Sequence, residues 1–329
     1  MGKRLMVVLV SLLALVLAAG CGKTTGNESE QVNYPEKPIN FVVPWSAGGG
    51  SDRMARMVAD VIQSEKILPQ PLVVVNKPGG SAAVGMNEVA TKKGDPYTII
   101  GIVSAQISNP LTTGAEVKAS TFKPIAALAL DEYMLFTKAD SDLQSLNDVV
   151  EYAKANPGKL TVGGTGTGAE DQICLGLLQK SAGIKTEYVP FDSGGEVMSS
   201  LLGGHIQLAW ANPSEAASQL KAGMVKAIGI MAPERISAYP DVPTFKEQGV
   251  DAEFRQIRGI SGTPDMPDYA VKALADAMKK VSESERWQTE YIEKNGLTSQ
   301  YMGPDEFAQA INDAEQEYKE VLTDLGQIK

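Results

Sequence analysis

Two glycine-rich segments carry the residue types best suited to holding a small ligand. Residues 46–52 read SAGGGSD after the apolar run FVVPW, and residues 164–168 read GTGTG after the run LTVG. Glycines let the backbone approach a ligand and turn several N–H groups toward one point. Both segments precede an amphipathic helical pattern, and the positive end of such a helix favours a carboxylate or phosphate. Serine and threonine hydroxyls add further donors, so each segment is a candidate anion site.

Neither segment matches a nucleotide-binding motif. A P-loop ends in Gly-Lys-Ser/Thr, whereas here Gly50 is followed by Ser51 and Asp52. The chain also has few of the residues that catalytic sites commonly use, because it contains one histidine, His205, and besides Cys21 a single cysteine, Cys174. A zinc site or a Ser-His-Asp triad therefore lacks its parts. We interpret His205 as a structural or surface residue and Cys174 as a buried apolar side chain of a helix. The donors suit reversible capture without a metal or cofactor.

Further turns follow predicted strands. The turn NKPGGSAA after residue 75 either packs beneath the first glycine segment or contacts the ligand, and Trp45 either borders the ligand or belongs to the core. Turn chemistry alone explains the other glycines and prolines of this kind. The candidate ligand-binding residues all lie in such loops: Trp45, Ser46, Ala47, Gly48, Gly49, Gly50, Ser51, Ser81, Ala82, Ser104, Gly164, Thr165, Gly166, Thr167, Asp192, Ala211 and Asn212.

Short β-rich runs alternate with amphipathic patterns, which predicts an α/β fold with parallel sheets and crossover helices. The predicted strands span residues 39–43, 72–75, 97–103, 160–163, 186–189, 206–211 and 225–231. The predicted helices span residues 52–66, 86–92, 146–156, 169–182, 197–202, 214–221, 268–282, 285–295 and 305–325.

Two segments resemble boundaries between lobes. In residues 129–142 an apolar strand pattern runs into an acidic turn, and residues 255–264 are extended and rich in glycine. We therefore predict one lobe from residues 35–137 plus 259–329 and a second from 138–258. A ligand would lie in the cleft where loops from the two lobes face each other.

The N-terminus has the features of a bacterial lipoprotein signal. Lys3 and Arg4 precede an apolar run too short to span a bilayer, and small residues lead to Cys21. We predict that residues 1–21 are the signal region, with Cys21 lipidated, and that residues 22–34 are a flexible tether. The formal net charge of −10 argues against nucleic acid as a partner.

Several segments, in order along the chain, resemble the substrate-binding receptors of tripartite tricarboxylate transporters, the Bug or TctC-type family. They are YPEKPINFVVPWSAGGGSDRMAR, VVVNKPGGSAAVGMNEVA, ANPGKLTVGGTGTGAE, VPFDSGGEVMSSLLGGHIQLAWANPSEA and YPDVPTFKEQG, followed by the C-terminal GTPDMPDYAVKALADAMKK and GPDEFAQAI. The resemblance implies a two-lobed periplasmic-binding-protein fold, type II-like, with the ligand cleft between the lobes. It implies that residues 46–51 and 164–167 hold a ligand carboxylate.

This chain departs from its relatives at two positions that concern the ligand. Glu170 and Asp171 lie where relatives often carry Thr and Ala within the sequence Ser-Thr-Ala-His. The two acids either complement the dipole of the following helix or meet a cationic group of the ligand. Many relatives have an acid at the position of Ala211, and its loss weakens the case for an amino acid held by an Asp–ammonium pair.

These features predict a monomeric extracytoplasmic receptor, anchored by lipid to the bacterial cell membrane. It would bind a small di- or tricarboxylate-like acid and deliver it to the permease subunits of the transporter. Two alternatives stay open: a secreted enzyme of the same fold acting on an anionic substrate, and a receptor that feeds a membrane signalling sensor.

Overall fold

The computed structural model describes residues 33–328, and the described residues from Tyr34 onward belong to one compact unit. The predicted signal, the lipidated Cys21 and most of the predicted tether lie outside the described residues. Tyr34, the last residue of that tether, already belongs to the folded part, because its hydroxyl donates a hydrogen bond of 2.5 Å to the carbonyl of Pro96. Within residues 33–328, every helix is too short or too polar to cross a bilayer.

The first sheet has six strands in the order β11-β4-β10-β3-β1-β2. They are β1 (Ile39–Val43), β2 (Leu72–Asn76), β3 (Thr98–Ile102), β4 (Lys123–Glu132), β10 (Arg255–Gly262) and β11 (Thr298–Met302). β1 is parallel to β2 and β3, whereas β10 is antiparallel to β3 and β4, and β11 is antiparallel to β4. The apolar runs of β1 and β3 are almost wholly buried because helices cover both faces of the sheet.

The second sheet has five strands in the order β7-β6-β8-β5-β9. They are β5 (Met134–Lys138), β6 (Thr161–Thr165), β7 (Glu187–Phe191), β8 (Leu208–Ala211) and β9 (Val225–Ile230). β6 is parallel to β7 and β8, and β5 is antiparallel to β8 and β9. Both sheets are therefore mixed, and the prediction of wholly parallel sheets is wrong for the strands next to the crossings between lobes.

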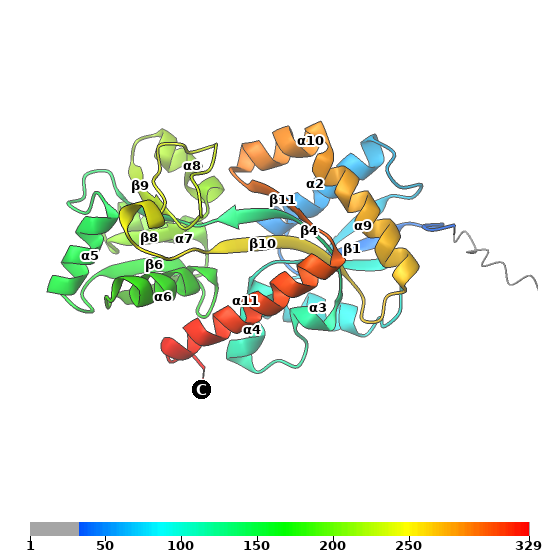
Figure 1. Ribbon diagram of the computed structural model, residues 1–329, viewed down its shortest axis with the longest axis horizontal. Helices are drawn as coiled ribbons and strands as arrows, with labels where there is room; N and C mark the ends of the chain where they lie inside the picture. Colours follow the sequence, from blue (N-terminus) through cyan, green and yellow to red (C-terminus); the bar gives the residue numbers. More distant parts are fainter. Residues whose placement is uncertain (1–32, 329) are drawn as a thin grey trace, which may run out of the picture. The chain divides into compact units, whose positions relative to one another are not determined.

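The chain passes between the two sheets twice (Figure 1). β4 ends at Glu132 and β5 begins at Met134, so the first crossing takes place at Tyr133. The second crossing lies between β9 and β10, which pairs with β4 along its whole length. Strand pairing places all of β5 in the second sheet and all of β10 in the first, although the predicted boundaries at residues 137 and 258 cut through both strands.

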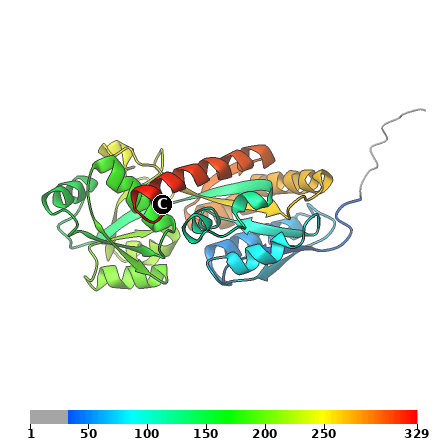
Figure 2. The same ribbon diagram turned by 90° about the horizontal axis from the view of Figure 1, so that it is seen from below.

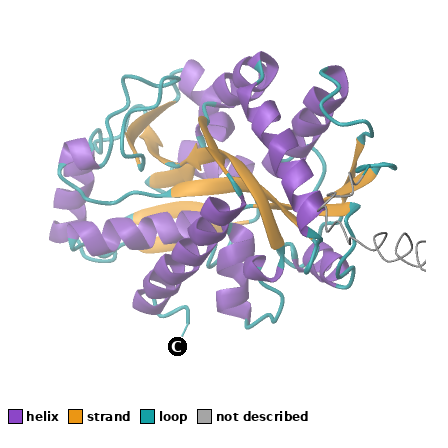
Figure 3. Ribbon diagram, turned by 45° about the vertical axis from the view of Figure 1, so that its right-hand side comes forward, coloured by secondary structure: helices purple, strands orange, loops and turns teal. Residues whose placement is uncertain are grey.

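Helices cover both sheets (Figure 3). Beside the first sheet are α2 (Gly50–Ser64), α3 (Ala83–Ala90), α4 (Ala105–Thr113), α9 (Asp268–Glu283), the short α10 (Glu285–Trp287) and the π-helical η3 (Gln288–Glu293). Beside the second are α5 (Leu146–Ala155), α6 (Glu170–Ala182), α7 (Gly194–Leu202) and α8 (Pro213–Lys221). Two 3₁₀ turns, η1 (Ala119–Thr121) and η2 (Lys246–Gln248), complete the connections.

The last helix, α11 (Pro304–Asp324), packs on elements of both lobes (Figure 2). It contacts α4 and β4 of the first lobe and α6 of the second. Where α6 and α11 meet, a Cβ built on Gly176 would lie 2.6 Å from Cγ1 of Val321, so the helices approach closely because this residue has no side chain. The buried hydroxyl of Tyr318 in α11 donates to Oγ of Ser104 over 2.9 Å. One buried apolar cluster accordingly contains residues of both lobes.

Candidate functional site

A cavity of about 480 Å³ lies between the lobes and is lined by loops from both sheets. Eight predicted site residues line it: Trp45, Ser46, Gly49, Gly50, Ser51, Thr165, Asp192 and Asn212. Glu170 and Asp171, which the sequence left open as partners of a cationic ligand group, also line it, and eight further lining residues were not predicted: Val103, Ala105, Tyr133, Ser193, Gly194, Glu215, Gln256 and Arg258. Trp45 lines the cavity and also packs, half-buried, against the core, so both interpretations of it apply.

The first glycine loop is held in shape by Asp52, which follows it on α2. Oδ2 of Asp52 accepts hydrogen bonds from the N–H of Gly48 over 2.8 Å and from Nε of Arg56 over 3.0 Å. Nδ2 of Asn76 donates to Oδ1 of Asp52 over 2.9 Å and to the carbonyl of Trp45 over 3.1 Å. Gly48 adopts a φ of +83°, a conformation that favours glycine. Burial alone would raise the pKa of Asp52, but the hydrogen bonds from Arg56, Gly48 and Asn76 outweigh it and lower that pKa to about 2.

The N-terminal amides of α2 remain available at the cavity. The first intrahelical bond runs from the N–H of Arg53 to the carbonyl of Gly49 over 2.9 Å, so the N–H groups of Gly50 and Ser51 precede it. The guanidinium of Arg258 lies directly beside this turn, because a Cβ on Gly50 would be 2.8 Å from its Nη2. Nε and Nη2 of Arg258 both donate to Oδ2 of Asp131, a residue 127 positions away in the sequence. This corner of the cavity therefore gathers donors suited to a carboxylate.

The second glycine loop is organised differently from the prediction. The N–H and hydroxyl of Thr165 both donate to Oδ2 of Asp171, over 2.5 and 2.9 Å, so neither donor is free for a ligand. The hydroxyl of Tyr188 donates to the carbonyl of Gly166 over 2.9 Å and fixes the turn from the other side. A Cβ on Gly164 would lie 2.4 Å from Cβ of Asp171, so a glycine is needed beneath the acid. Of residues 164–168, Thr165 lines the cavity, and its donors are engaged by Asp171, whereas the prediction expected them to face the ligand.

The acids at the start of α6 form part of the cavity wall. Glu170 and Asp171 are only 7% and 3% exposed, and burial raises the pKa of both carboxyls. Oε1 of Glu170 accepts a hydrogen bond of 2.7 Å from Nε2 of Gln256 on β10. Glu215 of α8 lies on the same wall, and its Oε2 accepts from the N–H of Asn212 over 3.3 Å. Glu170 and Asp171 thus lie at the positive end of α6 and also accept hydrogen bonds, Glu170 from Gln256 on β10 and Asp171 from Thr165 of the second glycine loop.

Nine predicted site residues lie outside the lining of this cavity: Ala47, Gly48, Ser81, Ala82, Ser104, Gly164, Gly166, Thr167 and Ala211. Several support it from behind. Ser104 is fully buried, and its Oγ accepts hydrogen bonds from Tyr318 and from the N–H of Ile257. Ser81 belongs to a separate cavity beside α3 and α4. Cys174 is buried in α6 and His205 is exposed in a turn, as their positions in the sequence predict.

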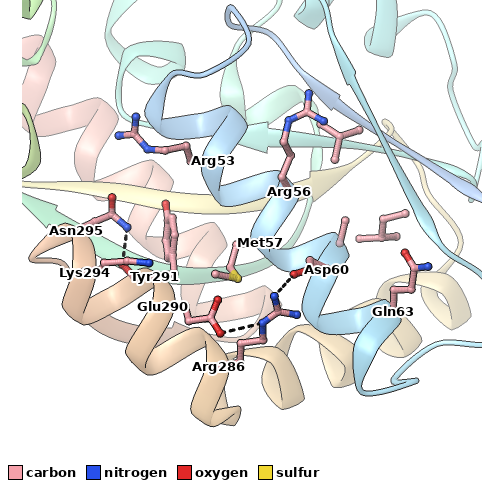
Figure 4. Close-up of a pocket in the computed structure, with 13 residues that line it drawn as sticks. Arg53, Arg56, Met57, Asp60, Gln63, Arg286, Glu290, Tyr291, Lys294 and Asn295 are labelled. Carbon is pink, nitrogen blue, oxygen red and sulfur yellow. Dashed lines mark hydrogen bonds and ion pairs between the residues drawn. The ribbon is translucent and has the colours of Figure 1, made fainter.

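A larger cavity, of about 690 Å³, lies beside α2 within the first lobe (Figure 4). Arg286 crosses it and pairs with Asp60 over 2.6 Å and with Glu290 over 3.2 Å. All its lining residues come from α2, β2 and residues 286–295, so movement of the second lobe would not enclose a ligand there. The smaller cavity, which both lobes line, is therefore the candidate ligand site.

The arrangement of two mixed α/β sheets around a shared cavity is that of the two-lobed periplasmic binding proteins. The family model described as "Tripartite tricarboxylate transporter family receptor" matches residues 54–327. The chain belongs to this family, and it is therefore a receptor for a solute rather than an enzyme.

Individual relatives resemble the chain over most of its length. A Cupriavidus necator protein, described as "UPF0065 protein in gbd 5'region", is 28% identical and covers 92% of this chain and 91% of its own. The crystal structure of a TctC solute binding protein from Polaromonas, solved without ligand, is 28% identical with a TM-score of 0.77, covering 88% of this chain and 99% of its own. An R. palustris protein solved with adipate shares the fold at 21% identity, with a TM-score of 0.77 over 89% of this chain and 98% of its own.

Proposed function

We propose that this protein is a lipid-anchored extracytoplasmic receptor that captures a small organic acid in the cleft between its lobes and delivers it to a tripartite tricarboxylate-type permease. The observation that carries the proposal is the convergence of the first glycine loop, the N-terminus of α2 and Arg258 on one cavity lined by both lobes. Membership of a receptor family and the adipate bound by a protein of the same fold support the proposal.

The proposed receptor has a defined binding site, a division into lobes and a mode of closure. We propose that Ser46, Gly49, Gly50, Ser51 and Arg258 receive a ligand carboxylate. We propose that the lobes follow the predicted division, residues 35–137 plus 259–329 for lobe 1 and 138–258 for lobe 2, except that the boundaries shift so that all of β5 falls in lobe 2 and all of β10 in lobe 1. Binding would favour the closed arrangement of the lobes, which the permease recognises in preference to the open one. We further propose that the receptor is a monomer.

A thermal-shift screen against small organic acids tests the proposed binding, because a ligand that binds only the folded state raises the unfolding temperature. Recovery of the unchanged acid by mass spectrometry after prolonged incubation is the expected result, and a converted product would contradict the proposal. Gly49→Leu supplies a variant of the site. A Cβ on Gly49 would lie 3.4 Å from the carbonyl oxygen of Ser46, so the variant should fold while its side chain occupies the mouth of the loop. Unchanged acid affinity in this variant would remove the first loop from the site.

Anchoring is tested separately in cells. We expect the full chain to partition with membranes and to incorporate labelled fatty acid, and Cys21→Ser to abolish the labelling. Labelling that persists in the variant would place the anchor elsewhere. Uptake of the identified acid in cells with and without the neighbouring permease genes separates delivery for transport from signalling through a sensor.

A further inference from the structure

The wall of the cleft is strongly acidic for a cavity proposed to hold an anion. Its lining contains four acids, Glu170, Asp171, Asp192 and Glu215, and one basic residue, Arg258. The positive charge of Arg258 is already compensated by Asp131. Two unit charges about 4 Å apart interact by roughly 4 kcal/mol at the effective dielectric constant typical of protein sites. A ligand with two carboxylates would therefore meet repulsion on the acidic side of the cleft.

The hydrogen bonds that reach this wall keep its carboxyl groups in the role of acceptors. Glu170 accepts from Nε2 of Gln256. Asp171 accepts from Thr165, and Glu215 accepts from the N–H of an asparagine. Donors of this kind favour the ionised form, but burial outweighs them and keeps the pKa of Glu170, Asp171 and Glu215 raised, so an added positive charge would be needed to hold the three groups as carboxylates.

A cationic partner for this wall is missing from the described part of the chain. Glu170, Asp171 and Glu215 form no ion pair with any lysine, arginine or histidine of residues 33–328. A buried carboxylate without a cation is costly, so the closed cleft would gain from a ligand that supplies one. A metal ion is a poor fit, because no three His, Cys, Asp or Glu side chains of the described residues are placed to coordinate one.

Tyr133 provides an independent indication of a ligand. It lies at the crossing between β4 and β5, lines the cavity and is only 5% exposed, yet its hydroxyl makes no hydrogen bond with any described residue. Burial raises the pKa of this hydroxyl well above its ordinary value, and the nearby charges of Glu170, Asp171, Asp131 and Glu215 raise it further. The side chain thus stays a neutral phenol near these carboxyl groups, with its ring packed edge-on against Phe254 at 5.4 Å between ring centroids and its oxygen free to accept a hydrogen bond.

The turn beside Arg258 has donors that the acidic wall lacks, and Arg258 is near enough for its charge to act on Glu170 and Glu215. Arg258, which is 8% exposed, uses Nε and Nη2 for Asp131 and leaves Nη1 without a hydrogen bond, next to Gly50. The unbonded amides of Gly50 and Ser51 lie at the same turn. The cavity is therefore lined both by donors, at this turn, and by acceptors, at Glu170 and Glu215.

We propose that the ligand is an amino-carboxylate, with its carboxylate at the turn of Gly50 and Ser51 beside Arg258 and its protonated amine between Glu170, Glu215 and the hydroxyl of Tyr133. This inference rests on the proposed function and names the ligand class of the same site. It assigns to Glu170 the second of the two roles open from the sequence. The amine meets acids of α6 and α8, so the apolar Ala211 is no obstacle to it.

Pairs of probes that differ mainly in one end group test the proposal. 6-Aminohexanoate is compared with adipate, and 4-aminobutyrate with succinate, together with a set of α-amino acids beside malate, by thermal shift and calorimetric titration at pH 7. We expect at least one amino-carboxylate to bind at least tenfold more tightly than every dicarboxylate. Glu170→Gln and Glu215→Gln should each lower that affinity at least tenfold, and Tyr133→Phe should lower it less. The matched control Glu187→Gln, on the exposed face of β7, should leave it unchanged.

The possible outcomes separate this inference from the proposed function. Tighter binding of a dicarboxylate than of every amino-carboxylate overturns the inference and leaves the receptor function in place. Unchanged amine affinity in Glu215→Gln, whose folding is checked by circular dichroism, also overturns it, even if Glu170→Gln fails to fold. If the wild-type protein binds none of these acids, the proposed function falls, and the inference falls with it.

Discussion

Replacing Gly50 with alanine should break the contact between the first glycine loop and the buried ion pair of Arg258 and Asp131. The new Cβ would lie 2.8 Å from Nη2 and 3.0 Å from Nη1 of Arg258. Ordinary contacts begin near 3.4 Å, so the guanidinium must retreat by about half an ångström or more. Arg258 has little room for this movement, because it is buried and both of its bonded nitrogens point to Asp131.

The expected loss of stability follows from these contacts. A hydrogen bond to a charged group contributes about 1.5–3 kcal/mol, and the displacement weakens one or both of the bonds to Asp131. Alanine at the first position of α2 returns about 0.5–1 kcal/mol relative to glycine. We therefore expect Gly50→Ala to lower the free energy of unfolding by about 1–2 kcal/mol and to weaken acid binding about tenfold, because Arg258 moves away from the donor corner.

Urea unfolding followed by circular dichroism measures the first effect, and calorimetric titration with the tightest acid from the screen measures the second. Gly49→Ala is the matched control, since Gly49 has a φ of −73° and its Cβ would lie 3.4 Å from the carbonyl oxygen of Ser46. The control should stay within about 0.5 kcal/mol of the wild type. Equal stability of the two variants would refute the packing of Arg258 against this turn.

Three further substitutions test parts of the structure around the cleft. Burial raises the pKa of Glu132 to about 7, so its carboxyl ionises at a lower pH in the unfolded chain than in the folded one, and stability is lost as pH rises from about 4.5 to 7. The free energy of unfolding of Glu132→Gln, relative to the wild type, should therefore rise by about 3 kcal/mol between pH 4 and pH 8 in urea unfolding. A difference between the two proteins that does not change with pH would contradict this. Because the pKa of Asp52 is low, its contribution to stability is present above about pH 4 and lost toward pH 2. Asp52→Asn should speed amide hydrogen exchange in the first glycine loop at pH 7. Unchanged exchange would show that other contacts hold the loop. Gly164→Ala should lower the free energy of unfolding by about 1–3 kcal/mol, because its Cβ would lie 2.4 Å from Cβ of Asp171. The control Gly195→Ala, whose Cβ would have no neighbour closer than 4.0 Å, should be tolerated. Equal urea midpoints of the two variants would count against tight packing between Gly164 and Asp171.

Local signals predicted the parts of the fold that depend on neighbouring residues. β1 has the predicted bounds, residues 39–43, and the two strand–glycine-loop–helix units are present. Ser145 caps α5 as expected, with its Oγ accepting from the N–H of Asp148 over 3.2 Å. Such features depend on hydrophobic period, turn residues and caps, all of which act within a few residues.

Elements that depend on distant partners were predicted poorly. β11 carries no clear strand signal, because three of its five residues, Thr298 to Gln300, are polar, and it is a strand through pairing with β4. β4 and β10 are antiparallel neighbours although more than a hundred residues separate them, and their pairing makes the first sheet mixed. α4 was missed because Pro110 and several polar residues interrupt its helical pattern.

The two glycine turns ahead of helices could be predicted from the chain, because glycine content and helical period are local properties. The use of the first turn depends on long-range packing, because it faces Arg258 from β10, whereas the second turn is closed locally by Asp171, which accepts from the N–H and hydroxyl of Thr165. Tyr133, Arg258 and Glu215 reach one cavity from three distant segments. Their meeting depends on strand pairing and on the packing of the lobes, and these long-range contacts leave no periodic trace in the sequence.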